Sequence, residues 1–295
     1  RLVQMIKDHK VTFSHCVPTI LQMVLNAEGA KDFDFGGMRV IIGGSALNRS
    51  LYNAAQAKGM QLGAAYGMSE TCPLISAGYI NLEDEAASEE QRISQRIKAG
   101  VPGPLVEARL MAADGSFLPK DGTTQGELVL RAPWLTQAYF REPEKSQELW
   151  AGGWLHTGDV ATISPAGTIE IRDRIKDVIK TGGEWLSSLE LEDRISRSPL
   201  VAEVAVVGIP DPRWDERPFA LVVPAAGQTV TAQAISDHLM PSVEEGHINK
   251  WAIPRQIAVV SEIPKTSVGK LDKKRIRGDI AGWLESEASC ISSLD

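Results

Sequence analysis

The sequence is poor in the features that mark disulfide-rich, membrane-spanning or nucleic-acid-binding proteins. It has three cysteines, Cys16, Cys72 and Cys290, and their odd number and wide spacing suit neither a disulfide framework nor a metal cluster. No apolar run is long enough to span a membrane, and no signal peptide is present. The net charge of −7 argues against a basic surface for nucleic acid. We therefore expect a protein of the reducing cytoplasm without nucleic-acid partners.

What the sequence does contain is typical of an ordinary globular protein. Its 295 residues are 43% hydrophobic and 23% charged, which is enough for one large or two ordinary domains with a sizeable core. The chain begins at Arg1, in what reads as mid-domain sequence, so we expect a fragment of a longer protein.

The stretch from residue 153 to residue 185 concentrates turn, charge and glycine signals. Residues 162–164 and 168–171 alternate around Pro165-Ala166-Gly167, which predicts a β-hairpin. Asp159 precedes it, and a carboxylate at a strand end can accept two hydrogen bonds from vicinal hydroxyls, as on a ribose, or can cap a turn.

Cations and glycines follow this hairpin. Arg172, Arg174, Lys176 and Lys180 suit either a solvated strand face or a ligand site. Gly182 and Gly183 leave room for a ligand to pass close to the backbone, just before a predicted helix. We interpret the whole stretch as a hinge between two domains.

A β-α-β unit is predicted near the N-terminus. Residues 38–42 and 60–66 read as strands, and Asn48 caps a helix between them, which implies a parallel sheet. Ligands bind such sheets beyond the carboxyl ends of the strands. The glycines here lack the spacing of a dinucleotide fingerprint.

The hexapeptide after the second strand is the stronger signal. Tyr66 can present its ring to a purine, and Gly67 permits close backbone approach. Glu70 can bind a hard cation such as Mg²⁺. Ser69 and Thr71 offer hydroxyl groups that can contact phosphate at a helix start. Taken alone, a capped helix opening at Ser69 is the better explanation, but together with the stretch 153–185 a ligand site is favoured.

The remaining elements complete the predicted architecture. Residues 83–98 read as a surface helix. Strands at 106–110 and 126–131 join the hairpin in a β-rich subdomain, whose core we expect Trp134, Tyr139 and Phe140 to fill. Residues 175–280 read as a compact α+β domain with a helix beginning at Ser187 or Ser188, and the polar tail from Glu285 is expected to fray. The predicted domains are 1–174 and 175–295.

Pro264 and Gly269 bracket a loop that presents Lys270. A compact ammonium group there can neutralise charge between a carboxylate and an α-phosphate. Lys273, Lys274, Arg275 and Arg277 follow, and we interpret them as a basic surface helix.

These segments resemble signature motifs of the AMP-forming acyl-CoA synthetase (adenylate-forming ligase) superfamily. The matching stretches are residues 153–159 (Gly-Trp-Leu-His-Thr-Gly-Asp), 173–180 (Asp-Arg-Ile-Lys-Asp-Val-Ile-Lys), 182–187 (Gly-Gly-Glu-Trp-Leu-Ser), 66–70 (Tyr-Gly-Met-Ser-Glu) and 264–270 (Pro-Lys-Thr-Ser-Val-Gly-Lys). Ser69 stands where the superfamily has Thr. The Trp after Gly-Gly-Glu resembles the fatty-acyl-CoA ligase members.

The resemblance implies an α/β fold: part of a parallel-sheet nucleotide-binding domain with a β-rich subdomain, then a small mobile α+β domain. It implies adenylation of a carboxylate by ATP with Mg²⁺, then thioester formation with coenzyme A. It leaves a homodimer open. The implied adenine pocket comprises Tyr66, Gly44, Ala64, Ala65 and Gly67. Ser69 would contact phosphate, Glu70 would hold Mg²⁺, Asp159 and Arg174 would meet the ribose, and Lys176 would be the pivot. Lys270 would serve adenylation, and Lys180, Gly182, Gly183 and Trp185 would serve thioester formation.

One family motif has no copy in this sequence. The Ser/Thr/Gly-rich phosphate loop that ends in Pro-Lys-Gly precedes the region present here, so we expect the chain alone to bind nucleotide poorly and to adenylate little. The first functional hypothesis is a ligase for medium- or long-chain fatty acids. The alternatives are an enzyme that loads an acyl carrier protein and a non-catalytic nucleotide-binding module.

Overall fold

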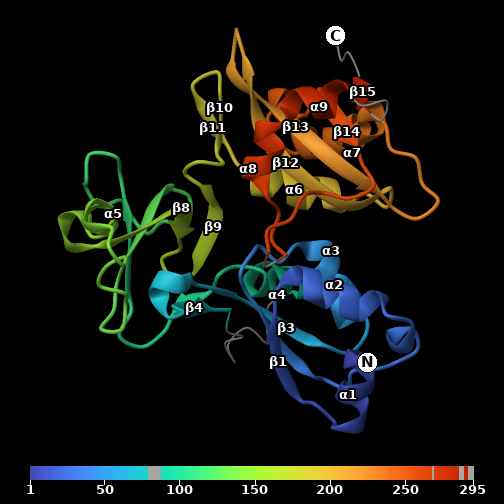
Figure 1. Cartoon of the computed structure of the whole chain (residues 1–295), viewed down its shortest axis with the longest axis horizontal. Coiled ribbons are helices and arrows are strands. Elements are labelled where there is room, and N and C mark those ends of the chain that lie inside the picture. Colours follow the sequence, from blue (N-terminus) through green and yellow to red (C-terminus); the bar gives the residue numbers. More distant parts are fainter. Residues whose placement is uncertain (79–87, 268, 286–288, 292–295) are drawn as a thin grey trace. The chain divides into compact units, whose positions relative to one another are not determined.

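A computed structural model describes residues 1–78, 88–267, 269–285 and 289–291 (Figure 1). The chain is α/β and divides into two compact units, Arg1–Ile175 and Lys176–Asp295. The predicted domain boundary, between residues 174 and 175, lies one residue from this division.

The first sheet of unit 1 is parallel where the β-α-β unit was predicted. Strands β1 to β3 pair in parallel, and two short antiparallel strands, β4 and β5, extend the sheet beyond β3. The predicted β-α-β unit is confirmed as β2, α3 and β3. The bounds are β1 (Phe13–Cys16), β2 (Arg39–Ile42), β3 (Gln61–Tyr66), β4 (Ser76–Ala77) and β5 (Val101–Pro102).

Helices pack on this sheet around one hydrophobic core. The side chain of Asn48 caps α3 by accepting a hydrogen bond from the Leu51 amide at 2.8 Å, as its position predicted. Helices α2 and α3 lie beside each other (Figure 1). The predicted helix at 83–98 is present as α4, and residues 79–87 lie outside the described residues. The bounds are α1 (Leu2–Asp8), α2 (Pro18–Asn26), α3 (Arg49–Gln56) and α4 (Glu89–Arg96).

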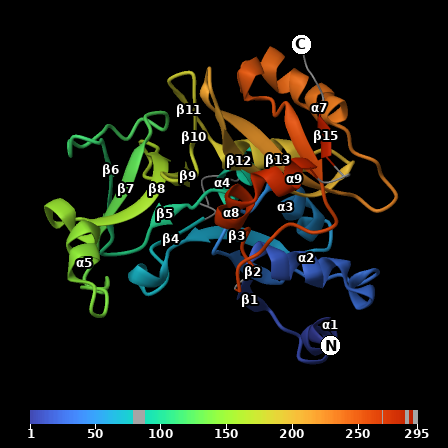
Figure 2. The same ribbon diagram turned by 45° about the horizontal axis from the view of Figure 1, so that its top comes forward.

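The second sheet of unit 1 is an antiparallel meander, β6 to β9, accompanied by α5 (Figure 2). The predicted hairpin is confirmed, since Ile163 pairs with Ile169 across its turn. Its first strand is longer than predicted, so Asp159 lies within β8, opposite Arg174 on β9, and not in a turn before the strand. The bounds are β6 (Glu107–Met111), β7 (Gly126–Arg131), α5 (Pro143–Leu149), β8 (Leu155–Ile163) and β9 (Ile169–Arg174).

The prediction that three aromatic side chains fill the core of this subdomain is wrong. Trp134 and Tyr139 are about one-third exposed and Phe140 is 85% exposed. The core consists instead of aliphatic side chains from the strands, such as Leu110 and Leu130. Because an indole and a phenol each carry a polar group, they can lie at a surface and hydrogen-bond there.

Unit 2 is built on a mixed sheet with a hydrophobic cluster on each face. Val204 and Val206 of β12 point into one cluster with α6 and α7, while Ala205 and Val207 point into the other with α8. The strand bounds are β10 (Ile179–Thr181), β11 (Glu184–Leu186), β12 (Val201–Asp211), β13 (Asp215–Pro224), β14 (Gln256–Val259) and β15 (Ser289–Ile291). The helix bounds are α6 (Ser188–Ser196), α7 (Ala232–Glu244), α8 (Lys273–Gly278) and α9 (Ile280–Glu285).

One feature of this unit was not predicted: Gly182 and Gly183 form the turn of a hairpin between β10 and β11, where both have positive φ, as a tight turn requires. The predicted helix start is confirmed, since the Ser187 side chain caps α6 by accepting from the Glu190 amide at 3.1 Å. Of the tail that was expected to fray from Glu285, Ser289–Ile291 form β15, which pairs antiparallel with β14, while residues 286–288 and 292–295 lie outside the described residues.

Candidate nucleotide site and its partners

The carboxyl end of β3 and the middle of β8 meet at a tyrosine–carboxylate pair. The Tyr66 hydroxyl donates a hydrogen bond to Oδ2 of Asp159, although the two residues are 93 positions apart. The other carboxylate oxygen of Asp159 lies 3.7 Å from Nε of Arg174. An aromatic ring, a carboxylate and a guanidinium group are thus adjacent at the end of the parallel sheet.

The protonation state of Tyr66 follows from this environment. Burial raises the pKa of the Tyr66 phenol well above its usual range, and the adjacent negative charge of Asp159 raises it further. Tyr66 therefore stays neutral near pH 7 and donates its hydroxyl proton to the carboxylate. Asp159 also has its backbone fixed, because its amide donates to the Thr157 hydroxyl at 3.1 Å.

Glu70 is held in place by the segment 134–139. The Tyr139 hydroxyl donates to Oε1 of Glu70 at 2.6 Å, and the Thr136 amide donates to the Glu70 carbonyl at 2.9 Å. The Trp134 indole donates to the next carbonyl, that of Thr71, at 3.1 Å. Two hydrogen bonds from this segment thus fix the carboxylate and the carbonyl of Glu70, and a third fixes the carbonyl of its neighbour Thr71.

The predicted helix at Ser69 is only a 3-10 turn, Ser69–Thr71. The Thr71 side chain is fully buried, and its hydroxyl lies between the Met68 amide at 2.8 Å and the Pro73 carbonyl at 2.9 Å. Thr71 is therefore occupied within the loop and does not face a phosphate. Ser69 is exposed.

Gly67 is required by the protein's own backbone. A Cβ at this position would lie 1.8 Å from the Pro73 carbonyl oxygen, so no larger residue fits without moving the loop. The close neighbour of Gly67 in the structure is Pro73, and the predicted contact of Gly67 with adenine stays a prediction.

The other residues of the predicted adenine pocket are arranged around the strand ends. Gly44 is exposed in the loop after β2. Ala64 and Ala65 are buried on β3, and Ala64 belongs to the hydrophobic core. Their contacts with adenine stay predictions.

The donor set at Glu70 suits Mg²⁺ held partly by a substrate. In the described parts of the chain, no group of three or more His, Cys, Asp or Glu side chains is placed to hold a metal ion. Mg²⁺ usually keeps several waters and takes one or two protein carboxylates together with phosphate oxygens. A single anchored glutamate fits this mode of binding and does not fit a cage made of protein ligands alone.

In unit 2, the predicted thioester-forming residues gather at the β10–β11 hairpin. Lys180 pairs with Trp185 across it, and the Trp185 side chain is 57% exposed. The Gly182 amide donates to the Trp214 carbonyl at 2.9 Å, and a Cβ at Gly182 would lie 3.0 Å from the Trp214 ring. Glycine at 182 thus lets the hairpin lie against this indole.

Lys270 lies on a second, separate hairpin of unit 2. The Thr266 amide donates to the Lys270 carbonyl at 2.8 Å, and the Lys270 amide donates to the Thr266 hydroxyl at 3.2 Å. The prediction of a loop that presents Lys270 agrees with this arrangement. Val268 lies outside the described residues.

Lys176 is exposed in the turn that begins unit 2. Its predicted role as a pivot, and the meeting of Lys180 or Lys270 with the residues around Tyr66, stay predictions.

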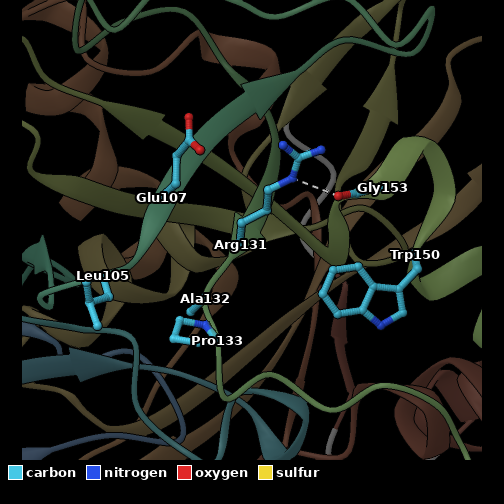
Figure 3. A pocket seen from close by; sticks show the side chains of 7 residues that line it. All are labelled: Leu105, Glu107, Arg131, Ala132, Pro133, Trp150 and Gly153. Carbon is cyan, nitrogen blue, oxygen red and sulfur yellow. Dashed lines mark hydrogen bonds between the residues drawn. The ribbon is translucent and has the colours of Figure 1, made fainter.

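A separate cavity lies on the second sheet of unit 1 (Figure 3). It has a volume of about 450 Å³ and is lined by Leu105, Glu107, Arg131, Ala132, Pro133, Trp150 and Gly153. Arg131 is fixed there by donating from Nε to the Gly153 carbonyl at 2.8 Å and by lying over the Trp154 ring at 4.1 Å. None of the predicted site residues lines this cavity.

Two family models match the chain in sequence order. Residues 1–140 match the AMP-binding enzyme model, and residues 190–270 match the model of the AMP-binding enzyme C-terminal domain. The chain belongs to the AMP-binding enzyme family.

Curated relatives of this AMP-binding enzyme chain activate different acids. It is 38% identical over 280 residues to a long-chain-fatty-acid–CoA ligase of Thermus thermophilus, a match covering 94% of the chain and 50% of the relative. It is 37% identical over 285 residues to a 3-methylmercaptopropionyl-CoA ligase of Ruegeria lacuscaerulensis, covering 96% and 52%. The chain thus spans about half the length of these relatives.

A solved structure shows the same fold. ATP-bound MatB from Rhodopseudomonas palustris matches with a TM-score of 0.79 and 26% identity, over 94% of this chain and 52% of that one. No helix in the described residues of the AMP-binding enzyme chain has the length and apolarity needed to cross a bilayer.

Three residues of these sites were missed by sequence reasoning. Tyr139 and Trp134, which hold the Glu70 segment, were expected in the core, and Trp214 was not singled out. An aromatic residue whose ring lies at a surface looks the same in a sequence as one in a core. The signal in the sequence near Trp214 is its neighbours Arg213 and Arg217, because a guanidinium group can lie over an indole ring.

Proposed function

We propose that the protein containing this chain is an AMP-forming acid–CoA ligase whose substrates are medium- or long-chain fatty acids. A carboxylate oxygen attacks the α-phosphorus of ATP, and pyrophosphate leaves. The thiol of coenzyme A then loses its proton, its sulfur bonds to the acyl carbon, and AMP leaves. Membership of the AMP-binding enzyme family and the CoA-ligase names of the relatives support the reaction class.

The observation that carries the proposal is the contact between Tyr66 and Asp159. If AMP binds at the end of β3, the Tyr66 ring lies against adenine while Asp159 accepts hydrogen bonds from the ribose hydroxyls. Two residues 93 positions apart are adjacent enough to touch one nucleoside.

In this proposal, unit 1 supplies most of the nucleotide site. Gly44, Ala64, Ala65 and Gly67 border the adenine, and Arg174 stands beside the ribose. Ser69 contacts phosphate. Glu70 holds Mg²⁺, which when bound offsets phosphate charge, and Tyr139 fixes the Glu70 carboxylate by its 2.6 Å hydrogen bond.

Unit 2 supplies two different lysines in turn. Lys270 neutralises the charge that develops between the carboxylate and the α-phosphate during adenylation. Lys180, Gly182, Gly183 and Trp185 serve the second step, and Lys176 is the pivot between the two orientations.

The surface around Trp214 suits the nucleotide part of coenzyme A. The guanidinium group of the exposed Arg213 lies 5.1 Å from the centre of the indole ring, and that of the buried Arg217 lies 5.9 Å from it. An exposed indole beside an exposed arginine can stack on an adenine and attract phosphates. Its position against Gly182 supports a path for the pantetheine arm along the β10–β11 hairpin.

The fatty-acid assignment depends on the long-chain-fatty-acid–CoA ligase among the relatives and on the Gly-Gly-Glu-Trp motif. The 3-methylmercaptopropionyl-CoA ligase, at nearly equal identity, favours a short acid. The choice between the two is made by experiment.

The test uses the longest open reading frame that contains this sequence. It is assayed with ATP, Mg²⁺, coenzyme A and carboxylic acids from two to eighteen carbons, with acyl-CoA and AMP as readouts. We expect equal amounts of AMP and acyl-CoA, with the highest kcat/KM for acids of about eight carbons or more. A preference for short acids would refute the fatty-acid assignment, and an AMP yield without acyl-CoA would refute the thiol acceptor.

Two variants separate the half-reactions. Lys270→Ala should slow acid-dependent ATP–pyrophosphate exchange by about a hundredfold or more, as expected for loss of a charge-stabilising group, and should spare thioester formation from supplied acyl-adenylate. Lys180→Ala should do the reverse. Equal effects of both variants on both steps would contradict the division of roles.

A further inference from the structure

The Lys270 hairpin ends at a buried cluster of charge in unit 2. Lys273, three residues after Lys270, is 8% exposed. Its Nζ lies 2.7 Å from Oε1 of Glu192 and donates to the Ser188 hydroxyl at 2.6 Å. The expectation that Lys273 belongs to a basic surface helix is therefore wrong, because its side chain points into the protein.

This cluster ties together three elements. Glu192 and Ser188 lie on α6, and the Glu192 carboxylate also accepts the backbone amide of Val206 on β12 at 2.8 Å. Among the described strands, β12 pairs with β13 alone, so Glu192 satisfies an amide on the open edge of the sheet. Lys273 is the first residue of α8, which packs in the cluster on the other face through Ile276.

The first leg of the hairpin, which precedes Lys270, has its own ion pair. Nζ of Lys265 lies 3.0 Å from Oε2 of Glu203 on β12, and both side chains are about 30% exposed. The legs also bond to each other, because the Asp272 amide donates to the Pro264 carbonyl at 2.8 Å. The loop that carries Lys270 is thus fastened on both sides, on one side by a nearly fully buried pair.

A buried ion pair is a poor source of stability, since apolar residues of similar volume often do as well. A buried ion pair does restrict the position of the two side chains, because any arrangement that separates the ammonium group from its carboxylate leaves both charges buried and unpaired. We propose that Lys273 is a positioning residue: its buried contact with Glu192 and Ser188 fixes the base of the hairpin that presents Lys270. The catalytic consequence rests on the proposed function.

The test begins with hydrogen exchange on the chain itself. The double variant Lys273→Met, Glu192→Gln removes both charges. The glutamine side-chain oxygen can still accept the hydrogen bond from the Val206 amide, so we expect the fold to be kept. We expect the hairpin amides of Thr266, Gly269 and Asp272 to exchange about tenfold faster, while amides in the middle of β13 keep their rates. The exposed neighbour provides the control, Lys274→Met, in which all of these rates stay unchanged.

Two results would overturn the anchoring. Unchanged hairpin exchange in the double variant would show that the pair fixes nothing. Equal acceleration in the hairpin and in β13 would show that the pair only stabilises the unit as a whole.

A kinetic measurement on the longest open reading frame tests the consequence for catalysis. The double variant should lower kcat for ATP–pyrophosphate exchange about tenfold or more, because a misplaced group loses effective concentration, with KM for the acid within about twofold and thioester formation from supplied acyl-adenylate unchanged. Equal losses in both half-reactions would refute the positioning role. If Lys270→Ala itself leaves exchange unchanged, the proposed role of Lys270 fails, whereas the hydrogen-exchange result decides the anchoring independently.

Discussion

At the residue scale, the proposed nucleotide site of unit 1 contains two tyrosine hydroxyls that face carboxylates. Tyr66 donates to Asp159, and Tyr139 donates to Glu70. In each pair the neutral phenol is favoured, because its anion would face a carboxylate. The hydrogen bond to Glu70, with some burial, raises the pKa of Tyr139 to about 12.

The raised pKa of Tyr139 predicts a loss of stability in alkaline solution. An unfolded tyrosine has a pKa of about 10, so both states are protonated below that pH and the stabilisation is complete. Between about pH 10 and pH 12 the unfolded state loses its proton while the folded state keeps it, so the free energy of unfolding falls as pH rises. Urea unfolding at a series of pH values should show a shallower decline in Tyr139→Phe than in the unaltered chain. Identical slopes would contradict the hydrogen bond to Glu70.

The sequence carried the residue types of this site but not their partners. Tyr66, Glu70 and Asp159 were recognisable because each has a chemical group suited to a nucleotide. That Tyr139 holds Glu70 was not predictable, because the contact joins loops 69 residues apart and depends on an aromatic ring lying at a surface. Lys273 was misjudged for a similar reason: in a run of cations, only tertiary contacts decide which one turns inward.

At the scale of elements, sequence signals predicted a helix or a strand correctly where the whole signal lies within one short segment. The β-α-β unit, the Asn48 cap and the 162–171 hairpin all follow from periodicity and turn residues. The β10–β11 hairpin and the extension of β8 back to Leu155 were missed, since strands of three residues carry almost no periodic signal and strand ends depend on the neighbouring strand.

The loop after β3 gives the sharpest prediction at this scale. Gly67→Ala places a methyl group 1.8 Å from the Pro73 carbonyl oxygen, so the loop must move. We expect a loss of roughly 2–3 kcal/mol in the free energy of unfolding, as for other overpacked sites, measured by urea denaturation. Gly29→Ala is the matched control in the same unit, because its Cβ would lie 3.7 Å from Val3, an ordinary contact. Equal stability of the two variants would contradict the described path of the loop.

At the scale of the whole molecule, the chain is two units joined at a short turn. Ile175 and Lys176, on either side of the division, are both exposed. A hinge requires few contacts across the linker and side chains free to turn.

Limited proteolysis tests this organisation. Endoproteinase Lys-C, which cuts after lysine, should cleave first after Lys176 and leave two fragments that resist further digestion, because each unit has its own hydrophobic core. Lys176→Gln should remove that first cut and slow the loss of the intact chain. Initial cleavage within either unit in the unaltered chain would contradict a division at this turn.

The most direct test is to measure AMP binding to this chain by saturation-transfer NMR. We expect weak binding, because the sequence has no copy of the family's phosphate loop. Saturation should be transferred from the protein to both the adenine and the ribose protons of AMP. Asp159→Asn and Tyr66→Ala should each weaken binding about tenfold, equivalent to about 1.4 kcal/mol, while Glu107→Gln, in the separate cavity, should leave it unchanged. AMP binding that is equally strong in Asp159→Asn, Tyr66→Ala and the unaltered chain would contradict the nucleotide site.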